Sequence, residues 1–195
     1  MFLNTSVAKK MFKRAFNSTG LVVARPNIDT IYIAGSGYEI EMDYENMPFK
    51  LKAAVIELIG EIPQVGKQIA ATKKSQKTEN CILPFSVYDE YLKAKDFMVQ
   101  CPVVIARPYF EYQLFQNSDM KIFVGTNREL LSMIDIREVD FENEGMPSGP
   151  CMIRGGVHLY WHNVAGTLKI ALEEFDNDAK TIVSMLHDLE VKRGD

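Results

Sequence analysis

Apolar residues recur along this chain with two spacings, and the clearest cycle of both lies within residues 20–62. Strict alternation over residues 38–44 predicts a half-buried strand in which Ile40 faces the core. The residues that alternate with it are expected to face water: Glu39, Glu41 and Asp43. A helix follows, because apolar residues are then spaced three and four apart. Its expected buried stripe consists of Leu51, Val55, Leu58, Ile59 and Ile62.

The same order of elements recurs later in the chain. An Arg-Pro pair ends a short strand at residues 25–26 and again 82 positions later, because proline cannot donate to a sheet ladder. Ile122 falls 82 positions after Ile40, and Ile170 lies in a third alternating hairpin, so all three are expected to face the core. We therefore predict an α+β fold: an antiparallel sheet of three hairpin-plus-helix units, with the helices packed on one face.

The expected domain organisation follows from this recurrence. Residues 5–62 and 86–134 form a candidate internal duplication. All 195 residues are expected to form one α+β domain, within which residues 1–72 and 81–195 are candidate halves. Residues 73–80 form the most polar run and lack an apolar anchor, so they are predicted to be an exposed loop that joins the halves.

The composition is typical of a globular protein, with 47% hydrophobic and 25% charged residues. No apolar run approaches the roughly 20 residues that a membrane helix needs, and the N-terminal residues show no secretion signal. Three cysteines without a CxxC pair are typical of reduced thiols. These features predict a cytoplasmic protein without membrane contacts, and the net charge of −4 gives no overall attraction to nucleic acid.

One strand face near the end of the chain carries aromatic and histidine side chains. His158, Tyr160 and His162 alternate with apolar residues and are therefore expected to face solvent or a partner. A metal site is not favoured, because about 13 Å of strand separates the two histidines, too far for one zinc ion. The remaining interpretations are an aromatic contact face for a protein partner and an ordinary sheet surface.

Two arginines and three methionines are further candidates for partner contacts. Arg25 and Arg107 hold corresponding positions beside prolines, and a symmetric pair of arginines can clamp an anion or a partner's carboxylate. An arginine at a strand kink more often bonds loop carbonyls. The methionines outside the clear apolar stripes suit adaptable contact surfaces: Met47, Met146 and Met152.

The basic residues of the first helix and of the segment 67–77 resemble a phosphate-binding surface. They are Lys9, Lys10, Lys13, Arg14, Lys67, Lys73, Lys74 and Lys77. If the fold gathers them, about six to eight cations neutralise several phosphates, and binding depends strongly on salt. No aromatic residues lie between the lysines of the polar run, and a solvated surface is the plainer interpretation.

No catalytic signature accompanies these surfaces. The sequence has no GxSxG motif, and its histidines lie in elements that amphipathicity already explains. We therefore predict a non-enzymatic regulatory protein, without metal or cofactor, that acts through protein contacts and self-associates. The alternative is a nucleic-acid-binding protein that uses the basic first helix and the 67–77 segment. A small enzyme stays open as a third class, because a sequence alone does not show convergence in space.

Overall fold

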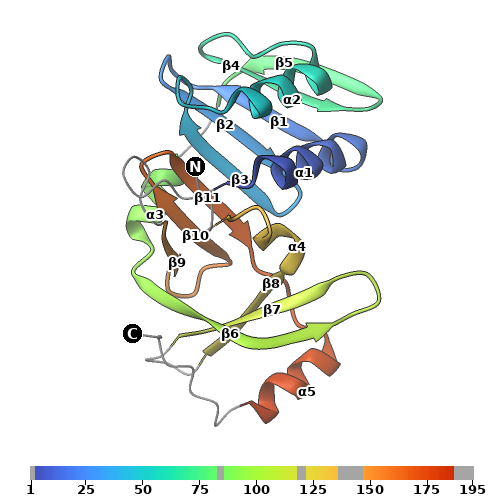
Figure 1. The fold of residues 1–195 in the computed structure, drawn as a ribbon, viewed down its shortest axis with the longest axis vertical. Coiled ribbons are helices and arrows are strands. Elements are labelled where there is room, and N and C mark those ends of the chain that lie inside the picture. The colour runs from blue at the N-terminus through green and yellow to red at the C-terminus, as the bar shows by residue number, and fades with distance from the viewer. Residues whose placement is uncertain (1–2, 83–85, 118–121, 136–146, 187–195) are drawn as a thin grey trace.

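A computed structural model describes residues 3–82, 86–117, 122–135 and 147–186 of the chain (Figure 1). In these residues five helices accompany one antiparallel sheet of eleven strands, which confirms the predicted mixed α+β class. The helices are α1 (Thr5–Asn17), α2 (Phe49–Ile59), α3 (Val87–Lys93), α4 (Arg128–Leu131) and α5 (Asn177–Met185). The strands are β1 (Leu21–Arg25), β2 (Thr30–Gly35), β3 (Tyr38–Asp43), β4 (Lys67–Thr72), β5 (Ser75–Asn80), β6 (Asp96–Ala106), β7 (Glu111–Asn117), β8 (Ile122–Asn127), β9 (Ser148–Met152), β10 (His158–Asn163) and β11 (Gly166–Ala171). Within the described ranges, no helix has the length and apolar character needed to cross a membrane.

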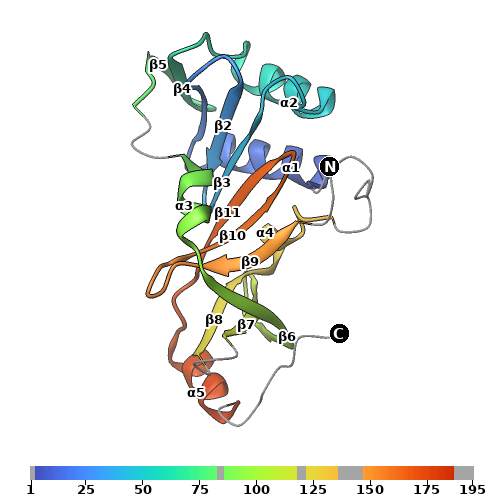
Figure 2. The ribbon, with the colours of Figure 1, turned by 90° about the vertical axis from the view of Figure 1, so that its left-hand side faces the viewer.

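Strands from the two ends of the chain meet in the middle of the sheet (Figure 2). The strand order is β5-β4-β1-β2-β3-β11-β10-β9-β6-β7-β8. β3 pairs with β11, so that Ile40 lies opposite Leu168 and Glu39 lies opposite Lys169. The first and last thirds of the sequence therefore share one continuous sheet.

α1 and α2 cover one face of the N-terminal part of this sheet (Figure 1). Met11 and Phe12 of α1 and Leu51 and Val55 of α2 are buried in one core with Ile40 of β3. The predicted stripe of α2 is thus confirmed for Leu51, Val55 and Ile59, while Leu58 and Ile62 pack partly buried against the same core. An apolar stripe on each helix and alternation on each strand account for this layer.

α3 lies on the opposite face of the sheet, so the expectation that the helices all pack on one face is wrong. Neighbouring residues of β3 point to opposite faces. Ile40 joins the core beneath α1, whereas Glu41 accepts hydrogen bonds from the backbone of α3. Polar contacts, which apolar spacing does not reveal, attach this helix together with a small apolar cluster around Val87 on the same face.

Residues 75–80 form the edge strand β5, which corrects the prediction of an exposed loop over residues 73–80. β5 pairs with β4 along its whole length, from Thr72 opposite Ser75 to Lys67 opposite Asn80. All six of its residues are exposed, as expected for this run. Backbone pairing through a tight turn needs no buried side chain, so the strand has no apolar signal in the sequence.

Burial tests the proposed equivalence of the hairpins. Ile40 and Ile170 are fully buried, as predicted. The prediction is wrong for Ile122, which is 44% exposed at the start of the edge strand β8. Both candidate repeats contain a helix, three antiparallel strands and a second helix, but a duplication stays a prediction.

The methionines proposed as contact residues are not surface residues where the structure describes them. Met47 and Met152 are buried in the main core, so the expectation of contact surfaces there is wrong. Met146 lies outside the described residues. A smaller second core lies beneath α5, where Ala179 packs with Leu114 and Tyr112 of β7.

Candidate functional site

A buried group of charges lies beneath α3. Lys169 of β11 is only 7% exposed, and its ammonium donates to Glu39 of β3 at 3.0 Å and to Glu90 of α3 at 2.7 Å. The hydroxyl of Tyr32 donates to Glu39 at 2.9 Å, and that of Tyr160 donates to Glu90 at 3.1 Å. Two strands and a helix are thus held together by one lysine.

The titration of these groups is set by burial and by their partners. Burial lowers the pKa of Lys169, but the hydrogen bonds to Glu90 and Glu39 together with the negative charges of these carboxylates outweigh it, so the pKa of this lysine is raised. Burial, followed by the nearby carboxylates, raises the pKa of Tyr32 and of Tyr160. Lys169 therefore stays protonated at neutral pH and is not a nucleophile.

Tyr160 and His162 lie beneath α3 and do not face solvent, which corrects the expected orientation for these two residues. His158 is half-buried and lines a cleft with Glu39 and Lys169. Tyr160 is 3% exposed. The His162 ring packs between Tyr88 and Tyr91 of α3, with ring centres 4.7 and 4.9 Å away. Burial lowers the pKa of both histidines, so both are neutral at pH 7. The physical reason for the error is that a helix covers this face through aromatic and charged contacts. A partner-binding role for the three residues stays a prediction.

Glu39 and Glu41 of β3 also have protein partners instead of facing water, whereas Asp43 is exposed, as expected. Glu41 accepts from the backbone N–H groups of Val87 and Tyr88 at 2.6 and 3.4 Å, at the start of α3. Burial raises the pKa of Glu41, although these two hydrogen bonds oppose the change. The carboxylate thus stabilises the first turn of the helix, in the place where a negative charge is favourable.

Arg25 and Arg107 do not form a clamp, because β1 and β6 are separated by five strands of the sheet. Arg25 donates to the carbonyl of Ile28 at 2.9 Å and lies 3.8 Å over the Tyr44 ring. Arg107 pairs with Asp176 at 2.5 Å, beside the start of α5. Each arginine contacts residues of its own part of the molecule, so the two arginines do not share one anion site.

The four basic residues of α1 are exposed on the outer side of the helix layer. Lys9 pairs with Glu57 of α2 at 2.6 Å, and its hydrogen bond lowers the pKa of Glu57. Lys10 and Arg14 pair with Glu129 of α4 at 2.9 and 2.5 Å. The hydrogen bond from Lys10 lowers the pKa of Glu129, and the charge of Arg14 adds to this effect. Both carboxylates therefore stay ionised and neutralise part of the basic charge.

The turn of the β4–β5 hairpin adds two lysines to this surface. The backbone N–H of Lys73 donates to the carbonyl of Phe16 at 2.9 Å, which fixes the turn to the C-terminal end of α1. We use the name basic helix surface for the six exposed residues that lie together there: Lys9, Lys10, Lys13, Arg14, Lys73 and Lys74. The other two predicted residues stay apart, because Lys67 bonds Asn80 at the far end of the hairpin and Lys77 pairs with Glu79.

Charge is separated between the two halves of the chain and between the two faces of the sheet. Residues 1–80 carry eleven lysines and arginines and eight acidic residues, a net charge of +3, whereas residues 81–195 carry −7. Three of those eight acidic residues lie on β3 on the face away from α1: Glu39, Glu41 and Asp43. The acidic character of the whole chain therefore does not describe the face covered by α1 and α2.

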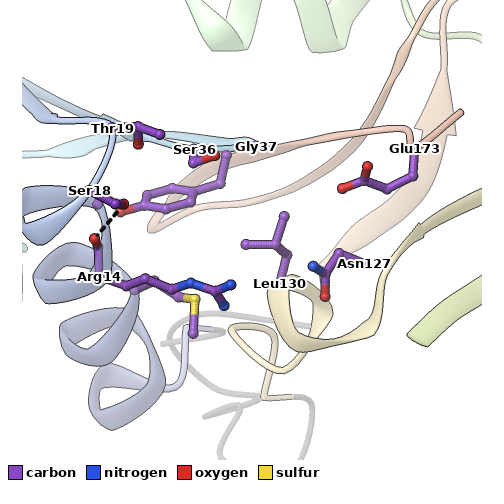
Figure 3. A pocket seen from close by; sticks show the side chains of 11 residues that line it. Arg14, Ser18, Thr19, Ser36, Gly37, Asn127, Leu130 and Glu173 are labelled. Atoms are coloured by element: carbon purple, nitrogen blue, oxygen red, sulfur yellow. Dashed lines mark hydrogen bonds between the residues drawn. The ribbon is translucent and has the colours of Figure 1, made fainter. Parts of the chain in front are cut away.

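A cleft of about 340 Å³ opens beside the basic helix surface, between α1, the β2–β3 turn and α4 (Figure 3). Figure 3 shows Arg14 and Glu173 reaching toward it from opposite sides, with Leu130 between them. Hydroxyl groups of Ser18, Thr19 and Ser36 complete its polar lining. The lining thus combines a cation, a carboxylate and several hydroxyl groups, all of which can bind a polar ligand.

Neither a metal centre nor an activated thiol emerges from the part of the chain that the structure describes. Among these residues, no three His, Cys, Asp or Glu side chains come close enough together to hold a metal ion. None of the three cysteines forms a disulfide, and burial raises the pKa of Cys101 to about 11, which leaves its thiol protonated.

Sequence reasoning missed Lys169, Glu90 and Tyr32. Lys169 lies between apolar residues in β11, and this alternation predicts that the lysine faces solvent. Only the pairing of β11 with β3, between segments far apart in sequence, brings it to Glu39.

Comparisons with models of protein families, with curated proteins and with solved structures find no match for this chain.

Proposed function

We propose that this protein binds nucleic acid through its basic helix surface. The single observation that carries the proposal is the bond between Lys73 and Phe16, which joins the lysine turn to the end of α1. Six exposed cations then lie on α1 and on the turn joined to its end, while Glu39, Glu41 and Asp43 lie on the face of β3 away from α1. The sequence alone favoured protein contacts, a preference that rested on the strand face around Tyr160 and on the methionines. Tyr160 is buried and His162 packs against α3. Met47 and Met152 are buried as well.

Phosphate groups are the natural partners of such a surface. Three of its six cations already pair with Glu57 and Glu129, so a polyanion competes with these carboxylates for them. Ion pairs this exposed contribute little to stability, and exchange of partners therefore costs little. Lys13, Lys73 and Lys74 are exposed and supply further charge. Binding is expected to weaken steeply as salt increases, because each phosphate contact releases condensed counterions.

Fluorescence anisotropy of labelled oligonucleotides, measured over a series of salt concentrations, tests the proposal. The variant K13E/K73E reverses two charges and leaves the ion pairs of Lys9, Lys10 and Arg14 intact. We expect weaker binding of every sequence. We also expect the slope of log K against log salt to fall by about 1 for each lysine.

The matched control is K95E/K180E, which reverses two exposed lysines outside the basic helix surface. This control changes the net charge by the same amount, so it separates a local contact from an effect of overall charge. Wild-type protein that retains neither duplex nor single strand at low salt contradicts the proposal. Equal losses for the two double variants contradict the choice of surface.

Self-association is a second candidate function, favoured by the edge strand β5. It ends the sheet, and all six of its residues are exposed. An exposed edge strand is a template for pairing with another chain. Light scattering over a wide range of protein concentration tests this candidate. A mass that equals one chain at every concentration contradicts it. Regulatory protein contacts and a cytoplasmic location likewise stay predictions.

A further inference from the structure

An exposed aromatic ring stands at the start of α2, on the same helix layer as the basic helix surface. Phe49 is 87% exposed, although it is the first residue of a helix whose stripe is otherwise well buried. α1 and α2 share one core on the same face of the sheet, and the pair between Lys9 and Glu57 joins their outer sides. Phe49 therefore belongs to the outer surface that carries the basic charge.

Cations and aromatic rings alternate around this residue. The Arg25 guanidinium lies 3.8 Å over the Tyr44 ring, and the Lys52 ammonium lies 4.5 Å from the same ring and 5.8 Å from that of Phe49. Lys50, the next residue of α2, is exposed. The structure thus supplies the interleaving of basic and aromatic side chains that the lysine run of residues 73–77 lacks.

We propose that Phe49 is a stacking platform for an unpaired base, and that the nucleic acid bound by this protein is single-stranded. This inference rests on the proposed function and makes its ligand specific. Stacking of a base on an exposed aromatic ring is favourable, and every base has a face that can stack in this way. The bases of a duplex already stack on one another, so only an unpaired base is free to cover Phe49. Lys50 and Lys52 then lie beside the phosphates that flank the stacked base.

The test compares three labelled ligands of equal length: a thymidine oligonucleotide, a duplex, and an abasic strand with phosphates but no bases. Phe49→Ala is expected to weaken binding of the thymidine oligonucleotide by about 5- to 150-fold, the range for loss of one stacked base. Binding of the duplex and of the abasic strand is expected to stay unchanged. The matched control is Tyr109→Ala, which removes a similarly exposed ring in the other half of the chain.

A second variant gives a direct spectroscopic signal. Phe49→Trp places an exposed indole at the platform, while the single native tryptophan, Trp161, is buried and serves as background. Quenching by the thymidine oligonucleotide but not by the abasic strand supports stacking. Unchanged binding by F49A together with no quenching overturns the inference. In that case a continued loss with K13E/K73E leaves the proposed function standing, whereas no binding of any ligand by the wild type refutes both.

Discussion

Lys169 of β11 stands directly opposite Glu39 of β3, and its ammonium donates to the Glu39 carboxylate at 3.0 Å. This pair lies at the junction where strands from the two ends of the chain meet. Glu90 completes the arrangement from α3 at 2.7 Å from the same ammonium. One side chain therefore connects three segments that are far apart in the sequence.

Replacing Lys169 with methionine is expected to destabilise the protein. The substitution keeps the volume of the side chain but leaves Glu39 and Glu90 without their cation. Breaking a fully buried ion pair on one side costs about 3–5 kcal/mol, and the cost here is expected to be smaller because the Glu39 and Glu90 side chains are 30% and 26% exposed. Urea unfolding followed by circular dichroism measures the cost as a lower midpoint.

The triple variant K169M/E39Q/E90Q is the matched control for that substitution. Its neutral amides still accept hydrogen bonds from the Tyr32 and Tyr160 hydroxyls. Most of the lost stability is expected to return, because no charge is left buried without a partner. A triple variant as unstable as K169M alone shows that packing of the lysine stem, and not its charge, holds this junction.

The protein is expected to lose stability as the pH falls below about 6.5, the ordinary pKa of histidine. Burial lowers the pKa of His158 and His162 in the folded state, so the unfolded chain binds protons at a higher pH than the folded one. Stability from these residues is present above pH 6.5 and decreases on acidification. The raised pKa of Glu41 acts in the opposite sense. Melting temperatures of H158Q/H162Q are expected to fall less than those of the wild type between neutral and mildly acidic pH. Since Glu41 is present in both proteins, its effect cancels, and equal slopes contradict the prediction.

The parts of the fold that follow local patterns were predictable from the sequence. The alternation around Ile40 and the helical stripe of Leu51 and Val55 each depend on residues close in sequence, and all three are buried. Such periodicity reports burial directly. The order helix, strand, hairpin and helix at the start of the chain is local in the same way.

Contacts between distant segments decide the features that the sequence did not reveal. β5 forms through backbone pairing with β4 and through polar side-chain contacts such as that between Lys67 and Asn80, without a buried side chain of its own. α3 docks through Glu41, Glu90 and Lys169 and through an apolar cluster that includes Val87. Ile122 carries an apolar side chain at an exposed sheet edge, which no periodicity distinguishes from a buried position. The candidate site likewise combines features that local sequence reveals with contacts between distant segments. The basic residues of α1 could be named in advance, but their approach to Lys73 depends on how the hairpin meets the helix.

Replacing Tyr38 with phenylalanine is expected to stabilise the protein. The Tyr38 hydroxyl is buried and has no hydrogen-bond partner among the described residues. An unsatisfied buried polar group costs about 1–3 kcal/mol, which its removal recovers.

Gly35→Ala is expected to destabilise the protein, because an added Cβ would lie 2.5 Å from the Tyr38 hydroxyl and overpacking costs about 1–3 kcal/mol. Thermal unfolding checks both expectations, a higher melting temperature for Y38F and a lower one for G35A. A lower melting temperature for Y38F shows that the hydroxyl has a partner in solution.

Asp176 has two functions that two substitutions separate. One of its carboxylate oxygens accepts from the Arg107 guanidinium at 2.5 Å and from the backbone N–H of Ala179 at 2.8 Å, which caps α5. Asparagine caps a helix as well as aspartate does, so D176N removes only the charge opposite Arg107. D176A removes the cap as well and is expected to cost about 1 kcal/mol more than D176N. Urea midpoints measure this difference, and amide hydrogen exchange locates it, with faster exchange expected at Ala179 and Lys180 in D176A alone. If the two variants unfold at the same midpoint, the pair with Arg107 accounts for the whole contribution of Asp176 and the cap adds nothing.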